Sequence, residues 1–202
     1  MSLMLRCLLL LLLLPFLAGM GTFPVGTAVT LSPLEGTTEG IDPRLLGRWR
    51  TAAEGKEPNA TVELRRSKAQ IDRYEVLAPW YFARPVEGRL VKFKDKDREW
   101  TVLEGSVSVR AADTGLLLPA RHHFGITFDG NRLVVSLLSV QLGHMALTGG
   151  GAHGAEWVRD LETTWAGPVA VVVTDGRDLQ QQLILAARRI RPQWVVTFER
   201  EP

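Results

Sequence analysis

The sequence predicts an α+β protein in which a β-rich first half is followed by a sheet that carries two helices. Short apolar runs without helical periodicity recur up to about Leu118, and two segments of helical composition follow. A continuous apolar run, Val169–Val173, lies between those two segments and is typical of a buried strand. The 202 residues, 46% of them hydrophobic, are enough for one large or two small domains.

Residues 1–21 have the features of a signal peptide. Arg6 precedes the apolar run Cys7–Leu17, and the small residues Ala18, Gly19 and Gly21 follow it. A cut after Ala28 satisfies the same cleavage rule. Because Pro15 interrupts a run already shorter than the roughly 20 apolar residues of a spanning helix, a cleaved leader is favoured over a retained anchor. We therefore expect a secreted or periplasmic protein, associated with a membrane only if this segment is retained.

The composition excludes several classes of function. Cys7 is the only cysteine, so a chain that has lost its leader holds no disulfide, no thiolate zinc site and no cysteine nucleophile. The 24 basic and 22 acidic side chains nearly balance, which gives no electrostatic footprint for nucleic acid. We expect no nucleic-acid partner.

Residues 22–40 are rich in Thr, Gly, Pro and Ser, and we expect them to form an exposed, flexible spacer. A β-rich region then covers residues 41–118. Charges of alternating sign in Lys92–Trp100 predict a solvated hairpin that turns at Asp95–Asp97. The strand-like runs of this region are Leu46–Ala52, Ala60–Arg65, Tyr74–Leu77, Arg89–Phe93, Glu99–Leu103 and Ser106–Ala111.

Residues 119–202 predict an α+β domain in which two helices pack on one face of a four-stranded sheet. Asp129-Gly130-Asn131 is a strong hairpin signal, because Gly and Asn tolerate the positive φ of tight turns. Asp178–Ile190 combines helix formers with cations at its C-terminal end, and Pro192 stops it. The expected order is strand Arg121–Phe128, strand Arg132–Val140, helix Ala155–Trp165, strand Val169–Val173, helix Asp178–Ile190 and strand Gln193–Phe198.

This second half resembles the periplasmic domain of ExbD/TolR proteins, the small partners of proton-driven motors in bacterial envelopes. The resemblance is carried by the hairpin His123–Leu138, the helix Trp157–Trp165, the strand and turn Val169–Asp175 and the pair Leu179–Phe198. It implies a periplasmic module that binds a protein or the cell wall. Proton transfer is not implied, because the family's membrane-helix aspartate has no counterpart in the apolar N-terminus.

The first half offers a competing resemblance. Asp42–Trp49, with Gly47-Arg48-Trp49 entering a strand, is similar to the opening of lipocalins, and Arg200 matches the closing arginine that stacks on that tryptophan. This resemblance implies an all-β barrel that carries a ligand. It requires Asp178–Ile190 to be a strand, so we expect a helix there to exclude the barrel. Without the resemblance, Trp49 is an ordinary core residue.

No constellation of residues predicts catalysis or a metal site. His122 and His123 are adjacent in a predicted strand and therefore point to opposite faces. No metal-ligand spacing is present, so we expect surface or half-buried histidines without a ligand role. Neither Ser136 nor Ser139 lies in a nucleophile elbow. The four histidines are His122, His123, His144 and His153.

The remaining candidates have structural interpretations. Gly149–Gly154 is a flexible connection rather than a phosphate loop, since no Lys-Ser or Lys-Thr follows it. Asp175 and Asp178 are helix-capping residues. We therefore predict a non-enzymatic envelope module without cofactor or metal, whose partner is a protein or a second copy of the chain. The alternative is a secreted lipocalin-like carrier of a small apolar ligand. The sequence singles out no binding residues for either function.

Overall fold

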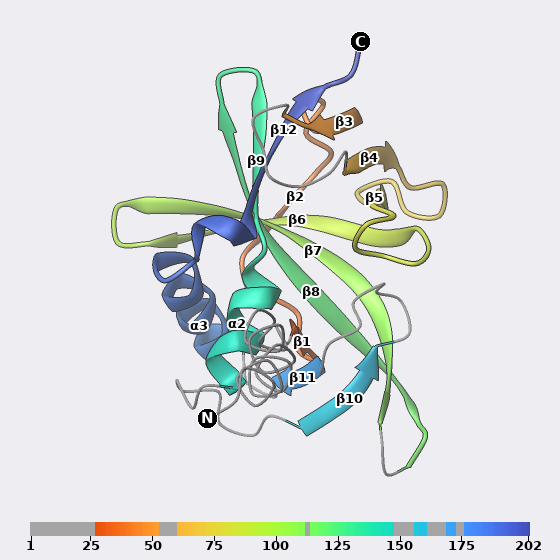
Figure 1. Ribbon diagram of the computed structural model, residues 1–202, viewed down its shortest axis with the longest axis vertical. Helices are drawn as coiled ribbons and strands as arrows, with labels where there is room; N and C mark the ends of the chain where they lie inside the picture. The colour runs from red at the N-terminus through yellow and green to blue at the C-terminus, as the bar shows by residue number, and fades with distance from the viewer. Residues whose placement is uncertain (1–26, 53–59, 112–113, 148–155, 161–168, 173–175) are drawn as a thin grey trace, which may run out of the picture.

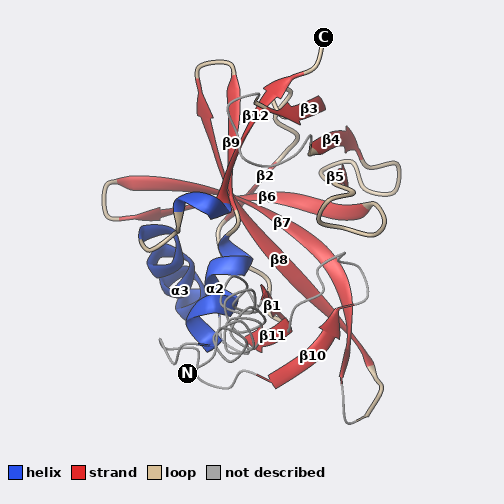
Figure 2. Ribbon diagram, viewed as in Figure 1, coloured by secondary structure: helices blue, strands red, loops and turns tan. Residues whose placement is uncertain are grey.

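The described residues form a closed antiparallel β-barrel with a smaller group of strands and two helices beside it (Figures 1 and 2). The computed structural model describes residues 27–52, 60–111, 114–147, 156–160, 169–172 and 176–202. Eight strands close the barrel, because β7 pairs with β6 and β12 pairs with β3. In order round the wall they are β3 (Gly47–Thr51), β4 (Thr61–Arg66), β5 (Tyr74–Leu77), β6 (Val86–Asp95), β7 (Arg98–Ala111), β8 (Leu117–Asp129), β9 (Arg132–Ser136) and β12 (Val195–Arg200).

The α+β prediction for the fold class is wrong. Strands β8, β9 and β12 do not form a sheet of their own but continue the wall that β3 to β7 begin. Each edge that a separate sheet would leave open is paired, since β12 lies between β9 and β3 and β8 lies between β7 and β9. Closing the sheet removes the unpaired edges, and the predominantly β architecture follows from that pairing.

Most of the predicted strands are present. The two runs expected between Glu99 and Ala111 form one strand, β7, and both predicted hairpins turn where expected. Asp95 pairs with Arg98, and Lys96 between them has φ 55°, while Gly130 in the second turn has φ 57°. These left-handed values are those that two-residue hairpin loops require.

Two elements of the second half differ from the prediction. The run expected to be a strand as far as Val140 ends at Ser136, and helix α2 (Leu138–Leu147) follows it. The helix expected over Ala155–Trp165 is a strand at β10 (Glu156–Asp160), because this segment pairs with β7 and with β11 (Val169–Val172). Residues 161–165 lie outside the described residues.

The expected spacer contains a packed strand. Within residues 22–40, β1 (Thr27–Thr30) is buried throughout and pairs in parallel with β11. One further pair, Thr30 with Arg121, connects β1 to β8, and β2 (Thr37–Glu39) lies along β6. Backbone pairing therefore orders a segment whose composition suggested a flexible linker. The described part of β11 has a strand on each side, as expected for a central strand.

Both helices pack on the outer wall of the barrel, side by side (Figure 2). The predicted helix Asp178–Ile190 is present as α3 (Gly176–Arg188), and Pro192 begins a short 3₁₀ turn, Pro192–Trp194, before β12. Helix α3 does not exclude the barrel, because β12 rather than this segment supplies the last strand. Our expectation that a helix over Asp178–Ile190 would exclude a barrel is therefore wrong. The contact joins Val91, Phe93 and Val102 of the wall to Leu138, Leu142, Leu179 and Leu183 of the helices.

No helix among the described residues is long and apolar enough to cross a membrane. The predicted signal peptide, residues 1–21, lies outside the described residues.

Candidate functional site

The interior of the barrel is the first candidate site. Side chains alternate across each strand, so that Leu103 of β7 faces inward while Glu104 faces the outer wall. The inward side chains form one continuous apolar core. A cavity of about 40 Å³ remains inside it, lined among others by Val62, Leu64, Val76, Ile126, Leu133 and Phe198. Ligand pockets generally hold about 300 to 1,000 Å³, so the cavity as it stands is too small for a ligand.

Three consecutive aromatic residues pack into the interior. We call Trp80, Tyr81 and Phe82 the aromatic plug; they lie between β5 and β6, where the amides of Tyr81 and Phe82 both donate to the Ala78 carbonyl at 2.8 and 2.7 Å. Tyr81 is fully buried and Phe82 is 2% exposed. The ring of Tyr81 stands edge-on to Phe82 and Phe124, with centroids 4.9 and 5.1 Å apart. Such contacts hold the plug inside the barrel.

A glycine of β7 makes room for the plug. Gly88 of β6 and Gly105 of β7 lie opposite each other. A Cβ atom on Gly105 would lie 3.4 Å from the end of the Phe82 ring and 3.8 Å from Phe124. The Phe82 ring therefore packs against backbone that no side chain covers.

A small polar group lies at the tip of Tyr81. Its hydroxyl is 3.1 Å from Nδ1 of His122 and 3.2 Å from Oγ1 of Thr27. Both partners are fully buried, His122 on β8 and Thr27 on β1. We call His122 and Thr27 the polar anchor. It connects the plug to the strand that follows the predicted leader.

The two adjacent histidines face opposite ways, as predicted, but neither is exposed. His122 points into the barrel, and His123 points outward beneath the residues that follow β1. Our expectation of surface or half-buried side chains is wrong for these two histidines because both faces of β8 are covered at this point, whereas His144 is half-buried as expected. The outer cover is α2, whose Ser139 hydroxyl accepts a bond of 2.8 Å from the His123 amide.

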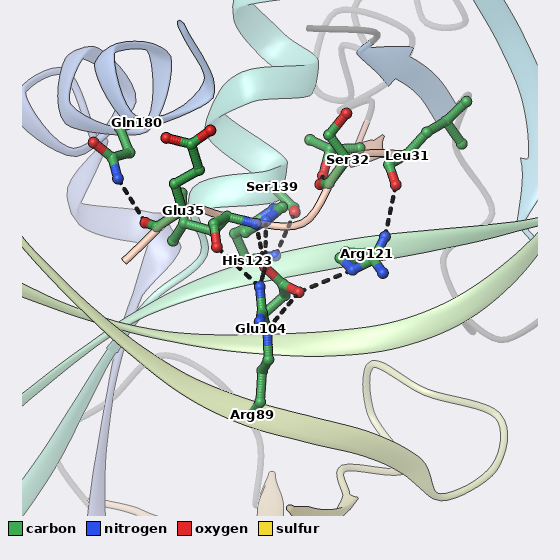
Figure 3. A network of polar contacts seen from close by, with 11 residues as sticks. Leu31, Ser32, Glu35, Arg89, Glu104, Arg121, His123, Ser139 and Gln180 are labelled. Atoms are coloured by element: carbon green, nitrogen blue, oxygen red, sulfur yellow. Dashed lines mark hydrogen bonds and ion pairs between the residues drawn. The ribbon is translucent and has the colours of Figure 1, made fainter. Parts of the chain in front are cut away.

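The outer wall holds a buried charge network centred on Glu104 (Figure 3). Arg89, Glu104 and His123 are paired neighbours on β6, β7 and β8. Nε of Arg89 lies 3.0 Å and Nε of Arg121 lies 2.9 Å from the carboxylate, and the Leu34 amide donates to it at 2.9 Å. The same arginines donate to the carbonyls of Leu34 and Leu31, at 2.9 and 2.6 Å. The network thereby fixes the segment after β1 to the wall.

Charge and burial shift two pKa values in this network. Burial, the largest effect on Glu104, raises its pKa, but contacts with His123, Arg89 and the Leu34 amide outweigh it and lower the pKa to about 2. Burial lowers the pKa of His123, although Glu104 opposes that shift. Nε2 of His123 is 3.6 Å from the carboxylate, too far for a hydrogen bond. His123 is therefore neutral at pH 7 between two arginines and a carboxylate.

These shifts predict that acid destabilises the fold. Both pKa values are lower in the folded state, so the stabilisation is present at neutral pH and is lost as the pH falls, first below about 6.5 for His123 and then from about 4.5 towards 2 for Glu104. For Glu104 the loss amounts to about 3 kcal/mol. Urea unfolding at pH 7, 5 and 3 measures it, in 0.5 M NaCl to screen the exposed pairs Glu63–Arg65 and Asp42–Arg44, which also lower carboxyl pKa values. A free energy of unfolding that is equal at pH 5 and pH 3 would contradict the assignment.

The other candidates from the sequence lie elsewhere. His144 of α2 contacts Arg191, with Nε2 2.8 Å from the guanidinium, and packs against Trp194. Asp178 lies within the first turn of α3 rather than before it. His153, Gly149–Gly154 and Asp175 lie outside the described residues. In the described part of the chain, no group of His, Cys, Asp and Glu side chains is arranged to hold a metal ion.

The lipocalin-like residues do meet. Arg200 of β12 pairs with Trp49 of β3, and its guanidinium lies 4.6 Å from the centre of the indole. The fold and the site thus define a closed eight-stranded antiparallel barrel with an apolar, plugged interior. Comparisons with protein-family models, with curated proteins and with solved structures find no match for this chain.

Proposed function

We propose that the protein is an exported carrier that holds a small apolar molecule inside the barrel. The observation that supports this most is the closed wall of antiparallel strands with an apolar interior and a residual cavity. Small barrels of this size hold either packed side chains or one small ligand. The contact between Arg200 and Trp49 is the one that the lipocalin resemblance implies, and it supports the proposal further.

Ligand entry requires the aromatic plug to move. The cavity of about 40 Å³ is much smaller than the roughly 150 Å³ that accommodates benzene in an apolar cavity. Removing the plug residues from the interior would add the volume of their rings to the cavity. The plug lies in a connection between strands, where outward movement leaves the pairing of β5 with β6 in place. In the proposed carrier, the aromatic plug therefore lies inside the barrel when no ligand is bound and moves out when the ligand binds.

The observation that suggested an envelope module with a protein partner no longer holds. It rested on a separate α+β second half, whereas β8, β9 and β12 are walls of the barrel. Our proposal accordingly keeps export and a non-enzymatic role and replaces the protein partner with a small molecule.

Binding of the neutral fluorophore N-phenyl-1-naphthylamine tests the proposal. We expect its fluorescence to rise on binding to the mature protein. Replacing Ala78, which lines the cavity, with leucine fills that space and should weaken binding by roughly tenfold, since lost volume removes apolar contact. The matched control is Ala60→Leu, a buried core alanine that does not line the cavity. Absence of probe binding, or equal weakening by both variants, would contradict the carrier.

A further inference from the structure

We infer that the aromatic plug is an internal substitute for the ligand and that the Tyr81 hydroxyl marks the place of a hydroxyl group on that ligand. The inference rests on the proposed function and names its ligand class. That class is an apolar molecule with a single neutral hydroxyl group, such as a phenol or an alcohol. The polar anchor, His122 and Thr27, is the part of the site that selects it.

The geometry of the anchor favours a hydroxyl over other polar groups. Nδ1 of His122 and Oγ1 of Thr27 lie 3.1 and 3.2 Å from the same oxygen of Tyr81. A hydroxyl donates one hydrogen bond and accepts others, so it serves both partners whichever tautomer His122 adopts. An ether or ketone oxygen only accepts, so it serves both partners only when His122 carries its proton on Nδ1, and a hydrocarbon serves neither partner.

The surroundings of the anchor favour a neutral group over a carboxylate. Tyr81 and His122 contact the apolar rings of Phe82 and Phe124. The cations nearest in sequence and pairing, Arg121 and Arg89, bind Glu104 on the outer wall instead. Among the described residues that contact the anchor oxygen, only His122 could supply a counter-charge to a carboxylate, and that histidine is itself fully buried.

Displacement of the plug takes the Tyr81 hydroxyl away from two fully buried polar groups. Losing a hydrogen-bond partner inside an apolar core is unfavourable, and a ligand hydroxyl in the same position restores it. A ligand that lacks the hydroxyl does not replace the hydrogen bonds that His122 and Thr27 make to Tyr81. A site built in this way discriminates between a hydroxyl compound and its hydrocarbon analogue.

The test removes the Tyr81 side chain and adds a free phenol that can take its place. Tyr81→Ala vacates the space of a phenol beside the anchor, and p-cresol and toluene differ only by the hydroxyl. We expect Tyr81→Ala to bind p-cresol at least about tenfold more tightly than toluene by isothermal titration calorimetry. Phe82→Ala is the matched control, because it vacates a ring-sized space seated on Gly105 while the Tyr81 hydroxyl stays beside His122 and Thr27. It should bind both compounds within about twofold of each other.

A second variant and a second measurement keep the outcome decisive. Adding His122→Leu to Tyr81→Ala should remove the preference for p-cresol. If Tyr81→Ala does not fold, the wild-type protein is titrated with N-phenyl-1-naphthylamine in competition with 4-butylphenol and butylbenzene. Equal affinities for the hydroxyl compound and its hydrocarbon overturn the inference but leave the carrier intact when the fluorophore binds. Failure of the fluorophore to bind overturns both.

Discussion

Replacing Glu104 with glutamine is expected to lower the free energy of unfolding by about 3 to 5 kcal/mol. The Glu104 side chain is 1% exposed, and two arginine side chains that are 16% and 24% exposed bind it. The neutral amide keeps the shape of the carboxylate but leaves both guanidinium groups without a counter-charge in a largely desolvated place. Urea unfolding at pH 7 measures the loss.

The same strand supplies the control. Glu99 of β7 is 53% exposed and lies 3.8 Å from Lys92 at the hairpin end of the sheet. Glu99→Gln should change the free energy of unfolding by less than about 0.5 kcal/mol, since an exposed pair is solvated and screened. Similar losses for the two variants would show that burial does not determine the strength of the Glu104 interactions.

The Glu104 network also bears on the interior site. It holds the Leu31 carbonyl through Arg121 and the Leu34 backbone through Arg89 and Glu104. These residues follow β1 directly, and β1 contributes Thr27 to the polar anchor. Charges on the outer wall thus fix the strand that presents one of the two anchor groups inside. This arrangement explains in physical terms why a segment of linker-like composition is ordered.

The strands were predictable from the sequence, whereas their closure into a barrel was not. Alternating and apolar runs such as Tyr74–Leu77 carry a local signal that survives in the fold. Closure depends on the pairing of β12 with β3, which joins Phe198–Arg200 to Trp49–Thr51 across most of the chain. No local pattern encodes such a pairing. The one sequence signal for it was Gly47-Arg48-Trp49 together with Arg200.

Errors in the prediction have identifiable causes. The helix Asp178–Ile190 was recognised from its composition, but its presence was given too much weight against the barrel, because a barrel tolerates helices on its outer wall. Helix α2 was missed because Leu137 and Leu138 continue the apolar run of β9. Strand β1 was missed because its pairing with β11 overrides a Thr-rich composition.

The candidate site had weaker signals. Trp80-Tyr81-Phe82 stands between two predicted strands, and three aromatic residues in a connection are unusual, because connections generally run over the surface. That pattern is the clue to the plug that sequence reasoning missed. Glu104 had no comparable signal, since an outward glutamate in a strand is ordinarily solvated, and its burial arises only when residues 31–35 cover the wall.

Trp49→Ala is expected to lower the free energy of unfolding by about 3 to 5 kcal/mol. Trp49 is 1% exposed, its Nε1 donates to the Leu45 carbonyl at 3.0 Å, and its ring packs against Phe128. The change leaves a large apolar space next to the seam between β3 and β12. Thermal and urea unfolding of the protein measure the loss.

Arg200→Ala separates burial of the indole from the cation above it. Arg200 also donates to the carbonyls of Leu46 and Arg44, but it lies at the exposed end of the barrel. An exposed cation–π contact contributes about 0.5 to 1 kcal/mol, so Arg200→Ala should cost about 1 kcal/mol, well below the cost of Trp49→Ala. The ordering follows because the tryptophan fills the core at the seam, whereas the arginine covers it from outside. A loss for Arg200→Ala as large as that for Trp49→Ala would mean that the arginine, rather than the buried indole, closes the barrel.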